Sequence, residues 1–252
     1  MRVALVTGGG RGIGRAIAFA LGGPDTFVAV AARSKAELDA TARDIEALGG
    51  RSLAAEMDLT NEESVARGVA LIARTAGHVD VLVNNAGVGG GEPIAGSDTA
   101  RWRKTIDTNV TGTYLVTRGI VPLMPIGGRI INISSVLGRF GVPGYTAYCA
   151  SKHAVIGFTR ALALELAPRQ ITVNALCPGW VETEMAVSGM KQGAAAGGIT
   201  YEQFREDALG RVPIKRIIQP EEVAELVRFL ASSAAAAITG QTHNICGGQT
   251  MD

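Results

Sequence analysis

The chain has 252 residues, of which 47% are hydrophobic and 33 are glycine, and its formal net charge is +1. A near-neutral chain without a Lys/Arg run lacks the basic surface that binds nucleic acid, and no apolar run is long enough to cross a bilayer. The cysteines, Cys149, Cys177 and Cys246, have neither disulfide-framework nor zinc spacing. We therefore expect no metal, no nucleic-acid partner and no membrane span. Because no signal peptide precedes the first strand, we expect a cytoplasmic location.

Short apolar runs alternate with longer segments of helical periodicity along the chain. The runs lie at 3–6, 27–32, 53–57, 79–83, 129–133, 171–176 and 242–245. Most are apolar nearly throughout, which is typical of strands buried on both faces of a parallel sheet. Capping boxes at 34–37 and 60–63 begin two helices, and Pro122 and Pro168 end two others. The pattern predicts an α/β fold: one domain over 1–252, with a doubly wound, Rossmann-like parallel sheet.

The segment at about 182–210 interrupts this alternation. Its stretch 190–198 is so rich in Gly and Ala that we expect it not to hold one conformation. It lies between the sixth strand and a last helix near 221–231, where an insertion can cover a site at the carboxyl ends of the strands. We therefore expect a mobile lid, the alternative being a disordered surface loop.

A Gly-rich turn at 7–14 joins the first strand to the first helix. Its glycines allow close backbone approach to a pyrophosphate, and the helix N-terminus offers amide donors and partial positive charge. An NAD-binding chain usually ends the second strand with an acidic residue, but here Arg33 follows that strand. Arg11 lies in the turn itself. Two guanidinium groups suit the 2′-phosphate of NADP(H), which we therefore favour over NAD; the alternative is two ordinary surface arginines.

Polar side chains follow the fifth strand and begin the next helix. Ser134 and Ser135 end the strand, and strand alternation allows only one of them to face the crevice, without deciding which. Tyr148 and Lys152 are four residues apart and therefore share a helix face. Tyr145 has no such lysine. A tyrosine pKa near 10 suits neutral pH poorly, and we expect a Lys ammonium and an oxidised nicotinamide to lower it, making Tyr148 an acid in reduction and a base in oxidation.

These residues resemble the short-chain dehydrogenase/reductase family over essentially the whole chain. The matching motifs are the Gly-rich turn at 7–14, Asn84-Asn85-Ala86-Gly87, Asn109, Ser135, Tyr148 with Lys152, and Pro178-Gly179. The resemblance selects Ser135 over Ser134 and implies a catalytic set of Asn109, Ser135, Tyr148 and Lys152. It implies a cofactor-binding set of Gly8, Gly10, Arg11, Gly12, Ile13, Gly14, Arg33, Asp58, Leu59, Asn85, Ala86, Gly87, Tyr148, Lys152, Pro178, Gly179, Val181 and Thr183.

The resemblance also implies individual roles. Asp58 would contact the adenine, and the segment 178–183 would bind the nicotinamide. Asn109 would hold a water that links Lys152 to solvent; the alternative is a packing asparagine. Within the family, 151–159, 177–183, 211–214 and 244–248 are similar to 3-oxoacyl carrier-protein reductases and actinorhodin-type polyketide ketoreductases. The stretch 88–91 lacks the proline of the polyketide enzymes, which leaves a polyketide substrate and the stereochemistry open.

The substrate pocket is expected between 138–145, 89–94 and the lid. Its predicted apolar side chains are Phe140, Val142, Pro143, Trp180, Val187 and Met190. Candidates for a basic entrance for an acyl-carrier protein are Arg139, Arg169 and Lys191, with solvated surface charge as the favoured alternative. The leading hypothesis is an NADPH-dependent reductase of a hydrophobic, 3-oxoacyl-like or polyketide-like ketone. The alternatives are an NAD-dependent secondary alcohol dehydrogenase and an inactive NADP-binding sensor. The resemblance implies a homotetramer built on 98–121, 146–167 and the C-terminal strand.

Overall fold

The computed structural model describes residues 1–251, and its central element is one parallel sheet of seven strands. The strands are β1 (Arg2–Thr7), β2 (Thr26–Ala32), β3 (Arg51–Glu56), β4 (Val81–Asn84), β5 (Arg129–Ile133), β6 (Thr172–Pro178) and β7 (Thr242–Ile245). Their order is β3-β2-β1-β4-β5-β6-β7. All six neighbouring pairs are parallel. The predicted doubly wound α/β fold is confirmed, with strand limits within two residues of the apolar runs.

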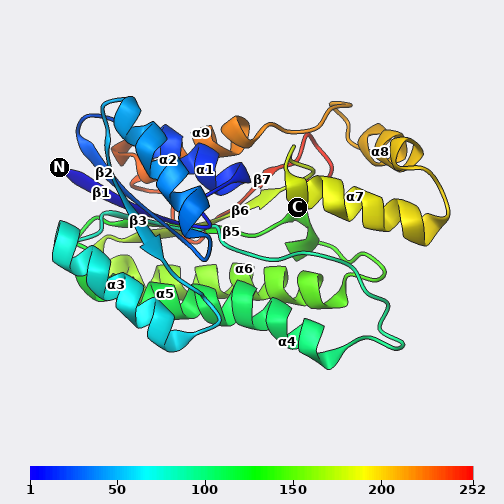
Figure 1. Ribbon diagram of the computed structural model, residues 1–252, viewed down its shortest axis with the longest axis horizontal. Helices are drawn as coiled ribbons and strands as arrows, with labels where there is room; N and C mark the ends of the chain where they lie inside the picture. Colours follow the sequence, from blue (N-terminus) through cyan, green and yellow to red (C-terminus); the bar gives the residue numbers. More distant parts are fainter. Residues whose placement is uncertain (252) are drawn as a thin grey trace.

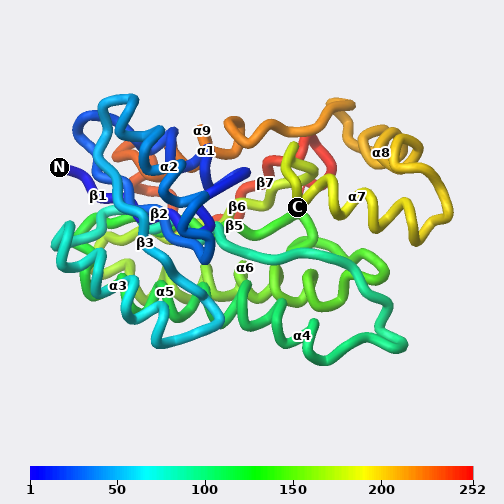
Figure 2. Tube along the Cα trace, viewed as in Figure 1, coloured from blue at the N-terminus to red at the C-terminus, as the bar shows by residue number. Residues whose placement is uncertain are grey.

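Helices cover both faces of the sheet (Figure 1). One face carries α1 (Gly12–Leu21), α2 (Lys35–Ala47) and α9 (Pro220–Ala231). The other carries α3 (Glu62–Ala76), α4 (Thr99–Ile106), α5 (Gly112–Ile120) and α6 (Thr146–Leu166). The helices α7 (Glu184–Gly197) and α8 (Tyr201–Gly210) extend past the carboxyl ends of the strands. Figure 2 shows the N-terminus at the opposite end of the sheet from α7, whereas the C-terminal segment returns beside α7.

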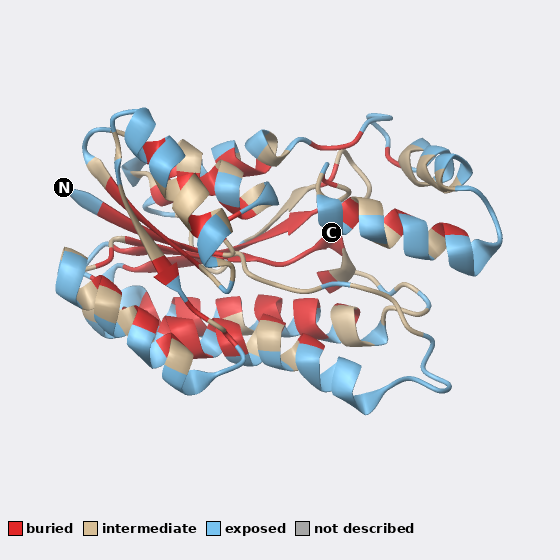
Figure 3. Ribbon diagram, in the orientation of Figure 1, coloured by how far each residue is buried: buried red, intermediate tan, exposed pale blue. Residues whose placement is uncertain are grey.

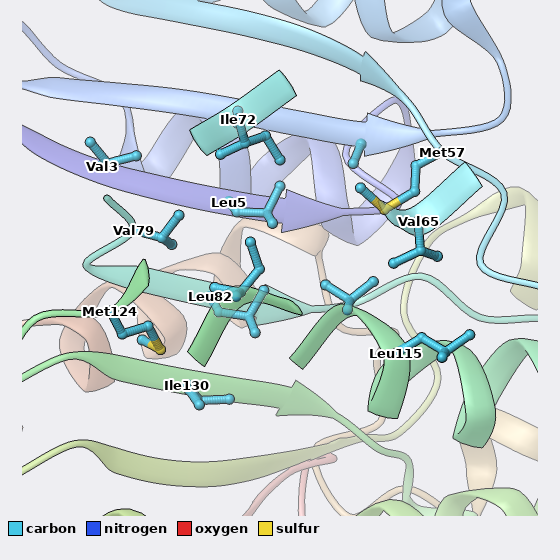
Figure 4. Packing of buried hydrophobic residues seen from close by; sticks show 14 of the residues in the cluster. Val3, Leu5, Met57, Val65, Ile72, Val79, Leu82, Leu115, Met124 and Ile130 are labelled. Atoms are coloured by element: carbon cyan, nitrogen blue, oxygen red, sulfur yellow. The ribbon is translucent and has the colours of Figure 1, made fainter. Parts of the chain in front are cut away.

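The apolar strands form a core on each face because successive side chains point to opposite sides. Val3 and Leu5 of β1 pack with the α3, α5 and α6 side, while Ala4 and Val6 belong to the core beneath α1 and α9. Figure 4 shows the first of these cores, with Leu5 close to Leu82 on the neighbouring strand. Burial is concentrated in the sheet and in the helix faces turned toward it (Figure 3). The rigid core holds the loops at the carboxyl ends in place.

Helix boundaries agree with the sequence in most places and differ at one cap. Ser34 caps α2 by accepting a hydrogen bond from the backbone N–H of Glu37 at 3.4 Å. At α3 the cap is Asn61, not Thr60: the Asn61 side chain accepts from the N–H of Ser64 at 2.9 Å. The predicted cap was wrong by one residue because two capping residue types stand next to each other. Short 3₁₀ turns containing the predicted prolines follow α5 and α6.

The stretch 190–198 was predicted not to hold one conformation, but the structure places it in the second half of α7 and its C-cap. The whole segment 182–210 is mostly helical. It forms α7 and α8, each with a side-chain cap at its start. Thr183 accepts from the N–H of Ala186 at 3.2 Å, and Thr200 forms a capping box with Gln203. Gly193 lies directly against the ring of Phe204, so the small residues let α8 pack on α7. Whether this helical pair moves as a lid stays a prediction.

No helix within residues 1–251 combines the length and apolar character that a membrane span requires.

Candidate active site

The turns after β1 and β4 are tied together at the point where the strand order reverses. The side chain of Thr7 accepts hydrogen bonds from the N–H groups of Asn85, at 3.0 Å, and Ala86, at 3.1 Å. The Asn85 amide donates back to the Thr7 carbonyl at 3.0 Å. A Cβ at Gly8 would lie 2.8 Å from the Asn85 side chain, and Gly8 has a φ of +66°. Open α/β sheets bind nucleotides in the crevice at such a reversal.

The first turn of α1 faces this crevice without a side-chain cap. Its amide groups are therefore open to an anion such as a pyrophosphate. Gly12, at the start of α1, has a φ of +52°, and a Cβ there would lie 3.3 Å from Thr183. The turn after β1 thus meets the segment 178–183 after β6. That segment is the one expected to bind the nicotinamide end of the dinucleotide.

The two predicted phosphate-binding arginines are exposed at the same end of the sheet. Arg33 follows β2 and lowers the pKa of Asp58 by its charge, although the hydrogen bond from the Thr60 backbone is the largest cause of that shift. Arg11 instead contacts two carboxylates: its guanidinium lies 2.8 Å from Glu184 and 3.8 Å from Glu37. The sequence analysis missed both carboxylates. The signal for Glu37 was an acidic residue in the first turn of the helix that follows Arg33.

Ser135, Tyr148 and Lys152 come together where β5 ends and α6 begins. The Ser135 hydroxyl acts to lower the pKa of the Tyr148 phenol, and it accepts a hydrogen bond from the Leu137 N–H at 3.2 Å. The Lys152 ammonium lies 5.5 Å from the centre of the Tyr148 ring and donates to the Ile133 carbonyl at 2.9 Å. Ser134 points elsewhere, donating from its hydroxyl to the Lys152 carbonyl at 2.9 Å. Strand alternation allowed only one of the two serines to face the crevice, and in the structure Ser135 is the one beside Tyr148.

Burial dominates the protonation of this group. It raises the pKa of Tyr148 to about 12, and the hydrogen bond from Ser135 opposes only part of that rise. It lowers the pKa of Lys152 to about 8. In the cofactor-free chain burial disfavours the Tyr148 phenolate, and the Lys152 ammonium is bound to the Ile133 carbonyl. Tyr148 holds its proton at neutral pH. The lowering of the tyrosine pKa expected from the ammonium together with an oxidised nicotinamide stays a prediction for the cofactor-bound enzyme.

Asn109 joins the loop after β4 to the start of α6. It lies in the π-helical segment Asp107–Thr111 between α4 and α5 and is 2% exposed. Its side chain accepts from the N–H of Val88 at 2.8 Å and donates to the Val88 carbonyl at 2.9 Å. It also donates to the hydroxyl of Ser151, which in turn donates to the Tyr148 carbonyl at 2.8 Å. Ser151, which the sequence analysis missed, thereby connects Asn109 to the tyrosine backbone.

A family model described as Enoyl-(Acyl carrier protein) reductase matches residues 8–250, from the Gly-rich turn to beyond β7. The chain belongs to the short-chain dehydrogenase/reductase family. It is therefore an oxidoreductase acting on CH–OH groups and the corresponding carbonyls.

Relatives of this dehydrogenase/reductase agree in sequence and in fold. A 3-oxoacyl-[acyl-carrier-protein] reductase of Synechocystis is 41% identical over 99% of the chain and 97% of the relative. A variant of an actinorhodin polyketide ketoreductase, crystallised with NADPH, is 42% identical, with a TM-score of 0.94 over 98% of this chain and 97% of that one. A dehydrogenase/reductase from Sinorhizobium meliloti is 31% identical, with a TM-score of 0.90 over 99% of this chain and 95% of that one.

The other predicted cofactor residues of the dehydrogenase/reductase lie at the carboxyl edge of the sheet, but not all expose a side chain. The Asp58 carboxylate accepts from the Thr60 N–H and hydroxyl, at 3.0 and 2.8 Å. Leu59 is 6% exposed and packs in the core, so only its backbone can face a ligand. A Cβ at Gly87 would lie 3.6 Å from the Lys152 ammonium. Gly10 lies against Glu37.

The segment after β6 is held firmly in place. The N–H of Gly179 donates to the Ile245 carbonyl at 3.0 Å, and Val181 forms an isolated parallel bridge with Ile218. Pro178 ends β6, and Thr183 caps α7. These anchored residues are placed to border a ligand that extends from the Gly-rich turn.

The substrate side differs from the prediction at α7. Met190 is 1% exposed and packs inward, so it does not line an open pocket. Met185, which the sequence analysis did not select, is 51% exposed, and its sulfur would lie 3.5 Å from a Cβ at Gly89. The same Cβ would lie 3.6 Å from the ring of Tyr148. Met185 and Met190 are five residues apart and therefore face different sides of α7. Which of them faces the substrate side could not be predicted while the segment was not recognised as a helix.

Two candidate entrance arginines are not free to receive a carrier protein. Arg139 donates to the Thr242 carbonyl at 2.7 Å, and Arg169 donates to the carbonyls of Val121 and Met124. Both are partly buried and hydrogen-bonded to backbone carbonyls, so neither is a fully solvated surface charge. Lys191 is exposed on α7.

Proposed function

We propose that this enzyme uses NADPH to reduce a hydrophobic ketone, of the 3-oxoacyl or polyketide type, to a secondary alcohol. The observation that carries the proposal is the meeting of Ser135, Tyr148 and Lys152 at the end of β5, with the Lys152 ammonium 5.5 Å from the centre of the Tyr148 ring. Burial raises the pKa of Tyr148 to about 12 and so keeps the phenol protonated. A ketone that accepts hydride develops negative charge on oxygen and needs a proton, which such a phenol can give. The similarity to a 3-oxoacyl-[acyl-carrier-protein] reductase and to an NADPH-bound polyketide ketoreductase supports the substrate class and the cofactor.

The residues present fit a phosphorylated dinucleotide. A side chain at Gly8 would fill the space beside Asn85, and the first turn of α1 offers uncapped amides. Arg11 and Arg33 would hold the 2′-phosphate, with Asp58 near the adenine and 178–183 at the nicotinamide. Bound NADPH supplies the hydride. A carboxylate in place of Arg33 would repel the phosphate, which is why we propose NADPH rather than NADH.

The side chains of the site orient the ketone, donate the proton and stabilise the charge that remains. Ser135 donates a hydrogen bond to the ketone oxygen and orients it toward Tyr148. Tyr148 transfers its proton to that oxygen as negative charge develops there. The Lys152 ammonium stabilises the phenolate that remains. Asn109, fixed by Val88 and Ser151, holds a water through which Lys152 exchanges protons with solvent.

The test is a panel of 3-oxoacyl thioesters, diketones and cyclic ketones assayed with NADPH and with NADH. We expect turnover with NADPH and a kcat/KM at least tenfold lower with NADH. Better turnover with NADH would favour the NAD-dependent alcohol dehydrogenase instead, and NADPH binding without any turnover would favour the inactive sensor.

We also propose a homotetramer located in the cytoplasm, assembled through 98–121, 146–167 and the C-terminal strand. Two observations support the assembly. Leu164 on α6 is 80% exposed, and β7 is an edge strand that pairs only with β6 within residues 1–251. An open strand edge can pair with another chain, and an exposed apolar side chain can pack against one.

A further inference from the structure

A cation stands at the rim of the substrate side and has no role in the proposed chemistry. Arg101, in the first turn of α4, is exposed. Its guanidinium would lie 2.7 Å from a Cβ at Gly90, the residue after Gly89. Gly89 itself faces the ring of Tyr148. Because neighbouring Cα atoms are about 3.8 Å apart, the guanidinium lies at most about 13 Å from the Tyr148 ring. Arg101 is therefore within reach of a substrate held at the tyrosine.

The neighbours of Arg101 come from both walls of the entrance. Gln192 of α7 lies 3.6 Å from the same Cβ position at Gly90, and its side-chain oxygen accepts from the Gly91 N–H at 3.4 Å. On the other side, Tyr145 packs against Gly91, and the charge of Arg101 acts to lower the pKa of that phenol, although burial raises it overall. Arg101 thus lies where the loop after β4 meets α7 and the start of α6.

No carboxylate within residues 1–251 lies within 4 Å of this guanidinium. Glu92 and Asp98 line the same hollow but are bound elsewhere. Glu92 accepts from the Asp98 N–H at 3.2 Å, and Asp98 accepts from the Ala100 N–H at 2.9 Å. An exposed guanidinium on the substrate side, without an ion-pair partner in the described residues, matches an oxyanion with its five donors.

We propose that Arg101 binds a negatively charged oxyanion that the substrate carries at a distance from its ketone. The preferred substrates are then apolar ketones with an anionic end, which deepens and rests on the proposed function. Two sources share this chemistry: the carboxylate of a free oxo acid, and a phosphate on the arm of a thioester. Either would lay the apolar part of the substrate beside Met185 and Tyr148 and leave the charge at the rim.

The experiment compares matched anionic and neutral substrates in three variants. One pair is an oxo acid with a distant ketone and its methyl ester; the other is a 3-oxoacyl coenzyme A thioester and the uncharged N-acetylcysteamine thioester of the same acyl chain. The variants are Arg101→Gln, Arg101→Lys and, as the matched control, Arg103→Gln. Arg103 is also an exposed α4 arginine without an ion pair in the described residues, but two positions along a helix it faces another direction.

We expect Arg101→Gln to raise KM about 10- to 100-fold for the anionic member of one pair, with kcat nearly unchanged and the neutral member unaffected. Arg101→Lys should restore part of the loss, because it keeps the charge without the fork geometry. The pair that responds identifies a carboxylate or a phosphate as the ligand.

Three results would overturn the subsite. Arg101→Gln could affect anionic and neutral substrates equally, it could affect neither pair, or Arg103→Gln could have the same effect. If the wild type reduces the neutral ketones with NADPH, that result leaves the proposed function standing. If the wild type reduces none of the four substrates, the proposed function fails and the subsite fails with it.

Discussion

At the scale of single residues, burial determines the protonation of two side chains of the site, Tyr148 and Lys152. Tyr148 is kept neutral and Lys152 is made easier to deprotonate, both because the low-polarity surroundings disfavour charge. The arrangement gives the reductive direction a ready acid at neutral pH. The reverse reaction needs the phenolate, which in the cofactor-free chain forms only in strong alkali.

The lowered pKa of Lys152 predicts a pH dependence. With the pKa at about 8, the ammonium is present below pH 8 and is lost as the pH rises through that value, whereas Tyr148 stays protonated throughout. We expect kcat/KM for NADPH in ketone reduction, which reports groups of the free enzyme, to be flat near neutrality and to fall above about pH 8. A kcat/KM that climbs steadily from pH 6 to pH 9 would contradict this reading.

Glu37 predicts a test of the cofactor pocket. Its carboxylate lies 3.8 Å from Arg11, so a 2′-phosphate must compete with it for that guanidinium. Since the pair is exposed, we expect Glu37→Gln to lower KM for NADPH only about two- to fivefold and to leave KM for NADH unchanged. Asp39→Asn, on the same helix, serves as the control. An equal change for both cofactors would show that Glu37 does not oppose the 2′-phosphate.

At the scale of elements, the sequence predicted the strands better than the segment 182–210. Strands such as β1 and β5 are buried along nearly their whole length and are mostly apolar, so their pattern is local and strong. The helix α7 is Gly- and Ala-rich, and the contact that stabilises it, Gly193 on Phe204, joins two helices and cannot be read from either alone. Glu184 was missed for the same reason, since its partner Arg11 is 173 residues away in the chain.

Two glycines of α7 predict opposite responses to the same substitution. A Cβ at Gly189 would make ordinary contact with Trp180 at 3.7 Å, so Gly189→Ala should stabilise α7 by roughly 0.5–1 kcal/mol. A Cβ at Gly193 would displace the Phe204 ring, so Gly193→Ala should destabilise the α7–α8 pair by about 1 kcal/mol or more. Hydrogen exchange of α8 amides should slow in the first variant and speed up in the second. Equal exchange in both would refute this packing.

At the scale of the whole molecule, the sheet brings together residues that the chain keeps far apart. The reversal of strand order between β1 and β4 places the Gly-rich turn beside Asn85, and β5 and β6 add Ser135 and Pro178 at the same edge. This placement was predictable from the alternation of strands and helices. The Asn109–Ser151 contact was not, because it depends on how the π-helical segment turns its side chains toward α6.

The exposed Leu164 and the open edge of β7 predict that the free monomer is not the stable form. We expect light scattering at micromolar concentration to give a mass near four times 26.1 kDa. Leu164→Lys, which places a charge on the predicted interface, should shift the mass downward. A wild-type mass of one chain would refute the assembly.

The central claim is that Tyr148 donates the proton in an NADPH-dependent ketone reduction. The most direct measurement is the steady-state rate of ketone reduction by the wild type and by Tyr148→Phe, with NADPH binding measured alongside by fluorescence. The substitution removes the hydroxyl and keeps the ring, so we expect kcat to fall by 10²-fold or more while the Kd for NADPH changes less than about threefold. Ketone reduction at near wild-type rate in Tyr148→Phe would contradict the mechanism.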